Sequence, residues 1–243
     1  MKENALNWSQ TIDGIYAEAR LSGWSDELAD LMQAYTLIEP MFTGWCRASG
    51  RPFLCHLIGT ASLMLQHGGT RDEVLAALAH AVIESGAYGR WGTRPRGEVR
   101  ALVADVLPPG SLRHVEAYSV FDWRSFINAA EHDLPGSLQK VDQTVLKLRI
   151  VNEIDDSLDW PFLTDRRREE GMRESDLSVM AARACGWTTL ANHMVSVRDI
   201  MSAVPRAEGI AREDYFVVPA GYELGIWMRA KRKLKSLLRP LGS

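Results

Sequence analysis

Helical periodicity runs through nearly the whole chain, and it excludes most fold classes. Apolar residues recur at the three- and four-residue spacing that places them on one helix face, whereas no convincing two-residue strand alternation occurs. The short run 215–219 is the only strand candidate, and it is too short to form a sheet alone. We therefore predict an all-α bundle with helices over residues 9–21, 26–43, 52–66, 71–85, 97–106, 111–119, 138–158 and 176–202.

Local patterns predict where several helices begin and end. Thr70 and Glu73 form a capping-box pattern, in which the hydroxyl and the carboxylate each bond a free backbone N–H at a helix start. The two glycines at 68–69 end the preceding helix. A turn is expected at 133–136, and the Arg- and Glu-rich segment 163–173 is expected to be a solvated loop or a helix start.

Length and composition indicate one sizeable domain with extensions. The chain has 243 residues and is 46% apolar, enough for a substantial core. It lacks the apolar stretch of a signal peptide and any run near the roughly 20 apolar residues that span a bilayer. Three cysteines without a C-x-x-C pair indicate reduced thiols, so we expect a cytoplasmic protein. We divide it into an N-terminal helix (1–24), a helical domain (25–204), a linker (205–222) and a basic amphipathic tail (223–243).

Charge is unevenly distributed along the chain. Six of the 28 basic residues follow Glu223, the last of the 31 acidic residues, so the tail carries +6 and the remainder −9. An acidic body argues against nucleic-acid binding by the domain, and we expect no specific nucleic-acid partner.

The tail has the pattern of a helix that lies on a membrane surface. Trp227 stands near its start, and Pro240 ends it. An apolar stripe opposite Lys and Arg residues is typical of an interfacial helix, so we predict that 226–239 binds an anionic membrane surface at the inner membrane face. A helix docked on the acidic body and a nucleic-acid-binding tail remain alternatives. The apolar stripe comprises Ile226, Ala230, Leu234, Leu237, Leu238 and Leu241.

Two histidines lie among aliphatic and small residues on consecutive predicted helices. A buried polar side chain must be hydrogen-bonded or must bind a ligand, because burying it unpaired is costly. His56 and His80 are therefore expected to face one pocket. The other histidines have no partner pattern and are interpreted as incidental: His67, His114, His132 and His193.

The predicted helix 138–158 is apolar almost all round its middle, so we expect it to be central. Asn152 either lines the histidine pocket or bonds a neighbouring helix, and both interpretations stay open. Asp155 is assigned to an acidic, solvated last turn, because charged groups are depleted from protein cores.

The segment around the histidines resembles a known enzyme family. The pattern comprises Arg47, Ser49-Gly50, Pro52, His56, the helix to the glycines at 68–69, and residues 76–85, with the two histidines 24 positions apart. It is similar to the HD superfamily of helical phosphohydrolases, in particular the hydrolase domain of RelA/SpoT-type guanosine tetra- and pentaphosphate enzymes. The resemblance covers roughly residues 40–90 and, more weakly, 141–158.

That resemblance implies an HD-domain-like bundle in which His56 and His80 are metal ligands. It further implies that Glu84 helps to activate the attacking water and that Arg47 packs near a nucleotide base. The chain departs from the family at two ligand positions, since Ala81 and Asn152 stand where the family has aspartates.

Two functions follow. In the first, the chain is a degenerate HD-like domain that binds a nucleotide or phosphorylated small molecule in a histidine-lined pocket, in a non-catalytic or regulatory role. In the alternative, it is a divergent metal-dependent phosphohydrolase in which His56, His80 and Glu84 hold Mn, Zn or Fe and the metal lowers the pKa of bound water. His80 and Glu84 are four residues apart, so they can converge on one helix face.

Overall fold

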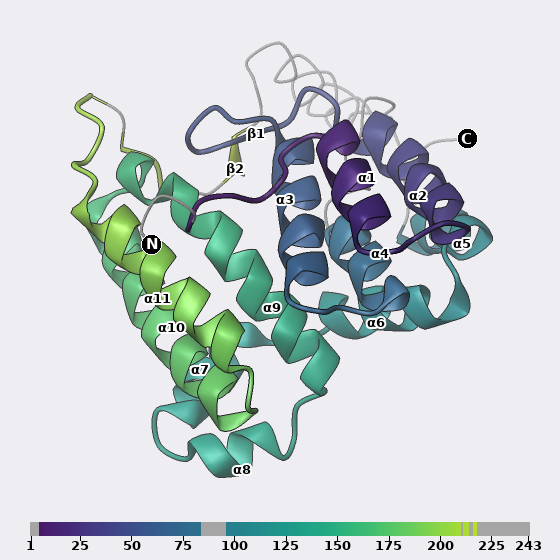
Figure 1. Ribbon diagram of the computed structural model, residues 1–243. Coiled ribbons are helices and arrows are strands. Elements are labelled where there is room, and N and C mark those ends of the chain that lie inside the picture. The colour runs from purple at the N-terminus through teal and green to yellow at the C-terminus, as the bar shows by residue number, and fades with distance from the viewer. Residues whose placement is uncertain (1–4, 84–95, 210, 214–215, 218–243) are drawn as a thin grey trace, which may run out of the picture.

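The computed structural model describes residues 5–83, 96–209, 211–213 and 216–217, and it confirms the all-α class (Figure 1). Within these residues the chain forms eleven α-helices, one 3-10 helix and one pair of two-residue strands. In chain order they are α1 (Ile12–Leu21), α2 (Glu27–Phe42), β1 (Cys46–Arg47), α3 (Phe53–Gln66), α4 (Arg71–Ala79), α5 (Arg96–Val106), α6 (Pro109–Ser119), α7 (Trp123–Ala130), α8 (Leu134–Leu138), α9 (Gln143–Asp156), η2 (Ser157–Phe162), α10 (Asp165–Ala184), α11 (Thr188–Ala203) and β2 (Phe216–Val217).

Helices α3 and α9 form the centre of the bundle. Helix α3 is apolar almost all round, as expected for a helix that is buried on every side, and its residues from His56 to Leu65 are all buried. It packs against α4 and α9, with α1 and α2 alongside. Figure 1 shows α9 running between this group and the α10–α11 pair.

The predicted helix 176–202 is two helices in the structure. Gly186 has φ of +77°, a left-handed conformation that ends α10, and the chain then reverses into α11. The segment 163–173, expected as a loop or helix start, is largely the first half of α10. Its exposed charges pair along the helix, with Arg166 and Arg167 both bonding Glu170.

Aspartate caps set three helix starts that differ from the predicted boundaries. Asp142 accepts hydrogen bonds from the first turn of α9, so that helix starts at 143 rather than 138. Asp133 caps α8 where only a turn was expected, and Asp122 caps α7, which was not predicted. The capping box of Thr70 and Glu73 at α4 is confirmed.

The predicted strand candidate does pair, but only over two residues. Cys46 pairs with Val217 and Arg47 with Phe216 in an antiparallel arrangement. Part of the predicted linker also contacts the body, since the backbone N–H of Arg212 donates to the carbonyl of Phe162 at 3.0 Å. None of the described helices combines the length and the apolar character that a membrane crossing requires. The predicted tail helix 226–239 lies outside the described residues.

Candidate functional site

The two predicted histidines meet at the ends of α3 and α4. His56 lies in the first turn of α3, and His80 caps the C-terminus of α4, which ends at Ala79 and not at 85 as predicted. Both side chains are buried. Their rings are nearly perpendicular, with centroids 5.2 Å apart. Glu84, the third residue of the predicted metal set, lies outside the described residues.

Each imidazole is fixed through its Nδ1 atom. His56 Nδ1 lies 2.7 Å from Asp155 Oδ2, and His80 Nδ1 lies 2.8 Å from the carbonyl oxygen of Ala77. Both partners accept hydrogen bonds, so each Nδ1 carries a proton. Within the described residues, neither Nε2 atom has a hydrogen-bond partner.

His80 is neutral at physiological pH. Burial, followed by the charge of His56, lowers its pKa to about 3, against the opposing hydrogen bond to Ala77. At neutral pH its Nε2 is therefore an acceptor, able to take a hydrogen bond or to ligate a metal.

Asp155 is the most heavily bonded side chain of the site. Its carboxylate accepts hydrogen bonds from Trp8 Nε1 at 2.9 Å, Gln10 Nε2 at 3.0 Å and both terminal nitrogens of Arg51 at 3.0 and 2.7 Å. Burial alone would raise its pKa, but the Arg51 charge and the bonds from His56 and Arg51 hold that pKa well below its usual range. The expectation of a solvated Asp155 is wrong: it is fully buried, because Arg51 and His56 supply donors and charge inside the core.

Arg47 adds two further carboxylates, Asp156 and Asp159, to the group around Asp155. It bonds Asp156 through Nη2 and Asp159 Oδ2 through Nε at 2.8 Å. The second oxygen of Asp159 accepts the backbone N–H of Ser49 at 3.1 Å. Arg47, which the resemblance places near a nucleotide base, thus connects β1 to the end of α9 and to η2.

Asn152 reaches the same cluster from one turn earlier on α9. Its Nδ2 donates to Asp156 Oδ2 at 2.9 Å, and Asp156 Oδ1 lies 3.6 Å from His56 Nδ1. Asn152 and His56 therefore meet at Asp156. The bond of Asn152 lies within α9 and not between helices, as one of the two open interpretations had it, and it places Asn152 close to the histidines.

Tyr118 on α6 extends the site beyond His80. Its ring centroid lies 5.3 Å from that of His80, edge to face. Arg149 on α9 donates to the Tyr118 hydroxyl at 3.5 Å and forms an ion pair with Glu153. A line of aromatic contacts thus runs from Phe53 through the two histidines to Tyr118.

Sequence reasoning missed the charged partners of the histidines. The missed charges share one property, which is that each lies in or beside an otherwise apolar stretch. The available sequence signal was an unmatched charge distribution. Three acidic residues lie in one segment, and the two basic residues lie far away in the chain. They are Arg51, Asp155, Asp156 and Asp159, together with Tyr118 as a ring partner.

The donor set of the described residues does not fit a metal centre. The carboxylates of Asp155, Asp156 and Asp159 accept hydrogen bonds on both oxygens and pair with Arg47 or Arg51, so a metal would compete with these donors and charges. This leaves the two Nε2 atoms, fewer than the three or four ligands that protein metal sites commonly have. Among the described residues, no group of three His, Cys, Asp or Glu side chains is placed to hold a metal ion.

Two histidines that were interpreted as incidental form a second pair. His67 Nε2 lies 2.8 Å from His193 Nδ1, and His193 Nε2 lies 2.9 Å from the carbonyl oxygen of Ala5. Their interpretation as unpartnered is therefore wrong. They connect α3 and α11 to the N-terminal segment, at the opposite end of α3 from His56.

Comparison with known proteins does not assign the chain to a family. No protein-family model matches the chain, and no curated protein is significantly similar to it. The likeness to the HD superfamily consequently rests on the residues around His56 and His80.

Proposed function

We propose that this chain is a degenerate HD-like domain that binds a nucleotide or another phosphorylated small molecule without hydrolysing it. The proposal rests on the ion-pair cluster, which comprises Arg47, Arg51, Asp155, Asp156 and Asp159. Arg47 and Arg51 bond the carboxylates beside His56, so these acids serve the fold, and a metal would compete with the arginine charges for them. Without a metal-activated water, hydrolysis of a phosphate ester at neutral pH lacks its usual nucleophile.

The chemistry of the two histidines indicates which part of a ligand they contact. The neutral His80 imidazole accepts a hydrogen bond at its unbonded Nε2, next to the unbonded Nε2 of His56, so the pair suits a ligand hydroxyl or amino group. The cluster behind them has three aspartates for two arginines, a net charge of −1 that repels phosphate. We therefore place the sugar or base of the ligand at the histidines and its phosphates away from Asp155.

Binding and turnover distinguish this proposal from the phosphohydrolase alternative. We expect guanosine tetraphosphate or guanosine diphosphate to bind in calorimetry with equal affinity in EDTA and in Mn²⁺, and to remain intact. His80→Ala should weaken binding about tenfold, the loss of one well-placed hydrogen bond in a desolvated site. The exposed His132→Ala is the matched control and should leave binding unchanged. Mn²⁺-dependent turnover that His80→Ala abolishes would establish the phosphohydrolase instead.

We further propose that 226–239 tethers the domain to anionic membranes. The described strand β2 supports this role, because its pairing with β1 fixes residue 217 opposite Cys46. The chain before the tail is thus held on the body, so a tail bound to a membrane would keep the body close to that membrane.

Liposome co-sedimentation tests the tether. We expect salt-sensitive binding to anionic vesicles that is lost when 224–243 is deleted or when Leu234 and Leu238 become Glu, because charge is screened by salt and the inserted face is removed. A double change of two exposed body residues, Leu21→Glu with Met180→Glu, adds the same charge and should bind normally. Equal sedimentation of full-length and truncated protein would reject the tether, and equally strong binding to RNA would indicate a nonspecific basic tail.

A further inference from the structure

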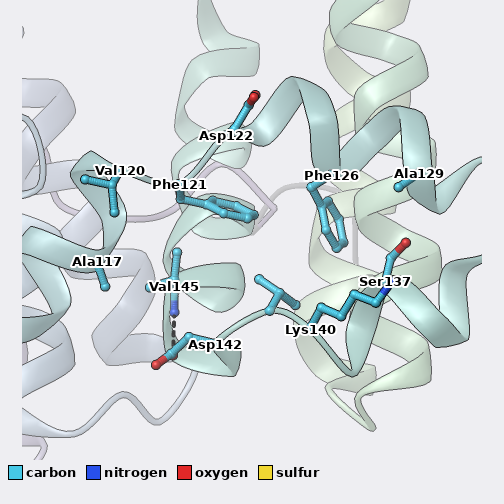
Figure 2. Close-up of a pocket in the computed structure, with 11 residues that line it drawn as sticks. Ala117, Val120, Phe121, Asp122, Phe126, Ala129, Ser137, Lys140, Asp142 and Val145 are labelled. Carbon is cyan, nitrogen blue, oxygen red and sulfur yellow. Dashed lines mark hydrogen bonds between the residues drawn. The ribbon is translucent and has the colours of Figure 1, made fainter.

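A second candidate site lies at the C-terminal end of α6. It is a cavity of about 440 Å³ between the end of α6, α7, α8 and the start of α9 (Figure 2). This volume is within the range of small-molecule pockets. Most of the lining is apolar, from Ala117, Val120, Phe121, Phe126, Ala129, Val141 and Val145.

The aromatic side chains give the cavity a preformed apolar wall. Figure 2 shows Phe121 and Phe126 side by side in its centre, with ring centroids 5.8 Å apart. Trp123 stacks behind Phe126 at 5.4 Å and supports it. Val120 at the edge is 81% exposed, so the apolar surface continues to the solvent. Water in such a space is poorly bonded, and an apolar ligand would displace it favourably.

Three of the four polar residues in the lining are already bonded. Asp122 accepts the backbone N–H of Ser125 at 3.0 Å as the cap of α7, and Figure 2 shows its carboxylate directed away from Phe126. Asp142 accepts the N–H of Val145 at 3.2 Å as the cap of α9. Both charges thus lie at helix N-termini, whose amides stabilise them. Ser137 donates its hydroxyl proton to a backbone carbonyl one turn earlier.

Lys140 is the fourth polar residue and the one cation among the lining residues that the structure describes. It is exposed, and none of the ion pairs among the described residues involves it. An ammonium beside an apolar cavity suits a ligand with an apolar body and an anionic group, because the chain fills the cavity while the anion pairs with the cation.

We propose that this cavity binds a long-chain carboxylate, with its apolar chain against Phe121 and Phe126 and its carboxylate on Lys140. The site shares none of its lining residues with the histidine site and stands independently of the function proposed above. The bound molecule is an amphipathic anion, whether it comes from solution or from a lipid surface.

Calorimetry with decanoate below its micelle concentration tests the site on the full chain. We expect one decanoate per chain. Ala129→Trp fills the cavity from an exposed position and should abolish binding, whereas Asn128→Trp, the neighbouring exposed residue outside the lining, should not. Lys140→Met should weaken decanoate two- to fivefold, about what a solvent-exposed ion pair contributes, and should leave the binding of decanol unchanged.

Several results would overturn this assignment. Absence of decanoate binding, or equal binding by the Ala129→Trp variant, would remove the cavity as the site. Equal affinity for decyltrimethylammonium would reject the role of Lys140. Concentration-dependent dimerisation that Ala129→Trp prevents would show that a second copy of the chain covers the cavity.

Discussion

Replacing Asp155 with alanine is expected to destabilise the protein by about 3–5 kcal/mol, a large part of the stability of a typical domain. The change leaves the Arg51 guanidinium buried without its main counter-charge. It also removes the acceptor for His56, Trp8 and Gln10 at once. Guanidinium denaturation monitored by circular dichroism measures the loss as a lower midpoint at constant slope.

Asp176→Ala is the matched control for this variant. Asp176 pairs with Arg198 on the surface, where its side chain is 62% exposed. Exposed ion pairs contribute little, so we expect a loss below about 1 kcal/mol. If Asp155→Ala lost no more than Asp176→Ala, the ion-pair cluster would not be the structural centre of the domain.

Asp155→Ala should also change the acid sensitivity of the protein. The pKa of Asp155 in the folded state lies well below the value of about 3.9 in the unfolded state. Its contribution is therefore present above pH 4 and is lost as the pH falls below the unfolded value, where the unfolded chain takes up the proton. Between pH 5 and 3, stability should decline less steeply in Asp155→Ala than in the parent protein.

Apart from the short α7, the sequence predicted the helices whose buried face is made of large apolar residues, and it failed for the first half of α10, where that face is mainly small. Helix α10 buries Gly171, Ser175, Ser178, Ala181 and Ala182, which allow close approach of a neighbouring helix but give no apolar stripe. Its charged first half consequently looked like a solvated segment.

Long-range pairing explains the other differences. The two-residue strand β2 exists because β1, about 170 residues earlier, supplies its partner, and no local pattern specifies that pairing. In the site, the meeting of His56 and His80 followed from their positions on consecutive helices. The burial of Asp155 could not be predicted in this way. Charged residues are on average depleted from cores, but Asp155 is paired there with Arg51, which lies 104 residues away in the sequence.

Gly59→Ala should be the second strongly destabilising substitution, although alanine is normally the better helix residue. A Cβ on Gly59 in α3 would lie 2.2 Å from Asp155 Oδ1 and 2.5 Å from Gln10 Nε2. Asp155 cannot move aside without loosening its bonds to Arg51 and His56. We expect a loss of about 3 kcal/mol, the upper range for overpacking of a core.

A second helical glycine supplies the control, and its replacement by alanine is expected to change the stability in the opposite direction. Gly97 lies in α5, and a Cβ added to it would meet no atom within 4 Å. Gly97→Ala should therefore stabilise the protein by about 0.5–1 kcal/mol through reduced entropy of the unfolded chain. Guanidinium midpoints of the two variants should thus move in opposite directions. A midpoint for Gly59→Ala at or above that of the parent would mean that α3 does not approach Asp155 closely, and the contact between the histidine helix and the ion-pair cluster would be refuted.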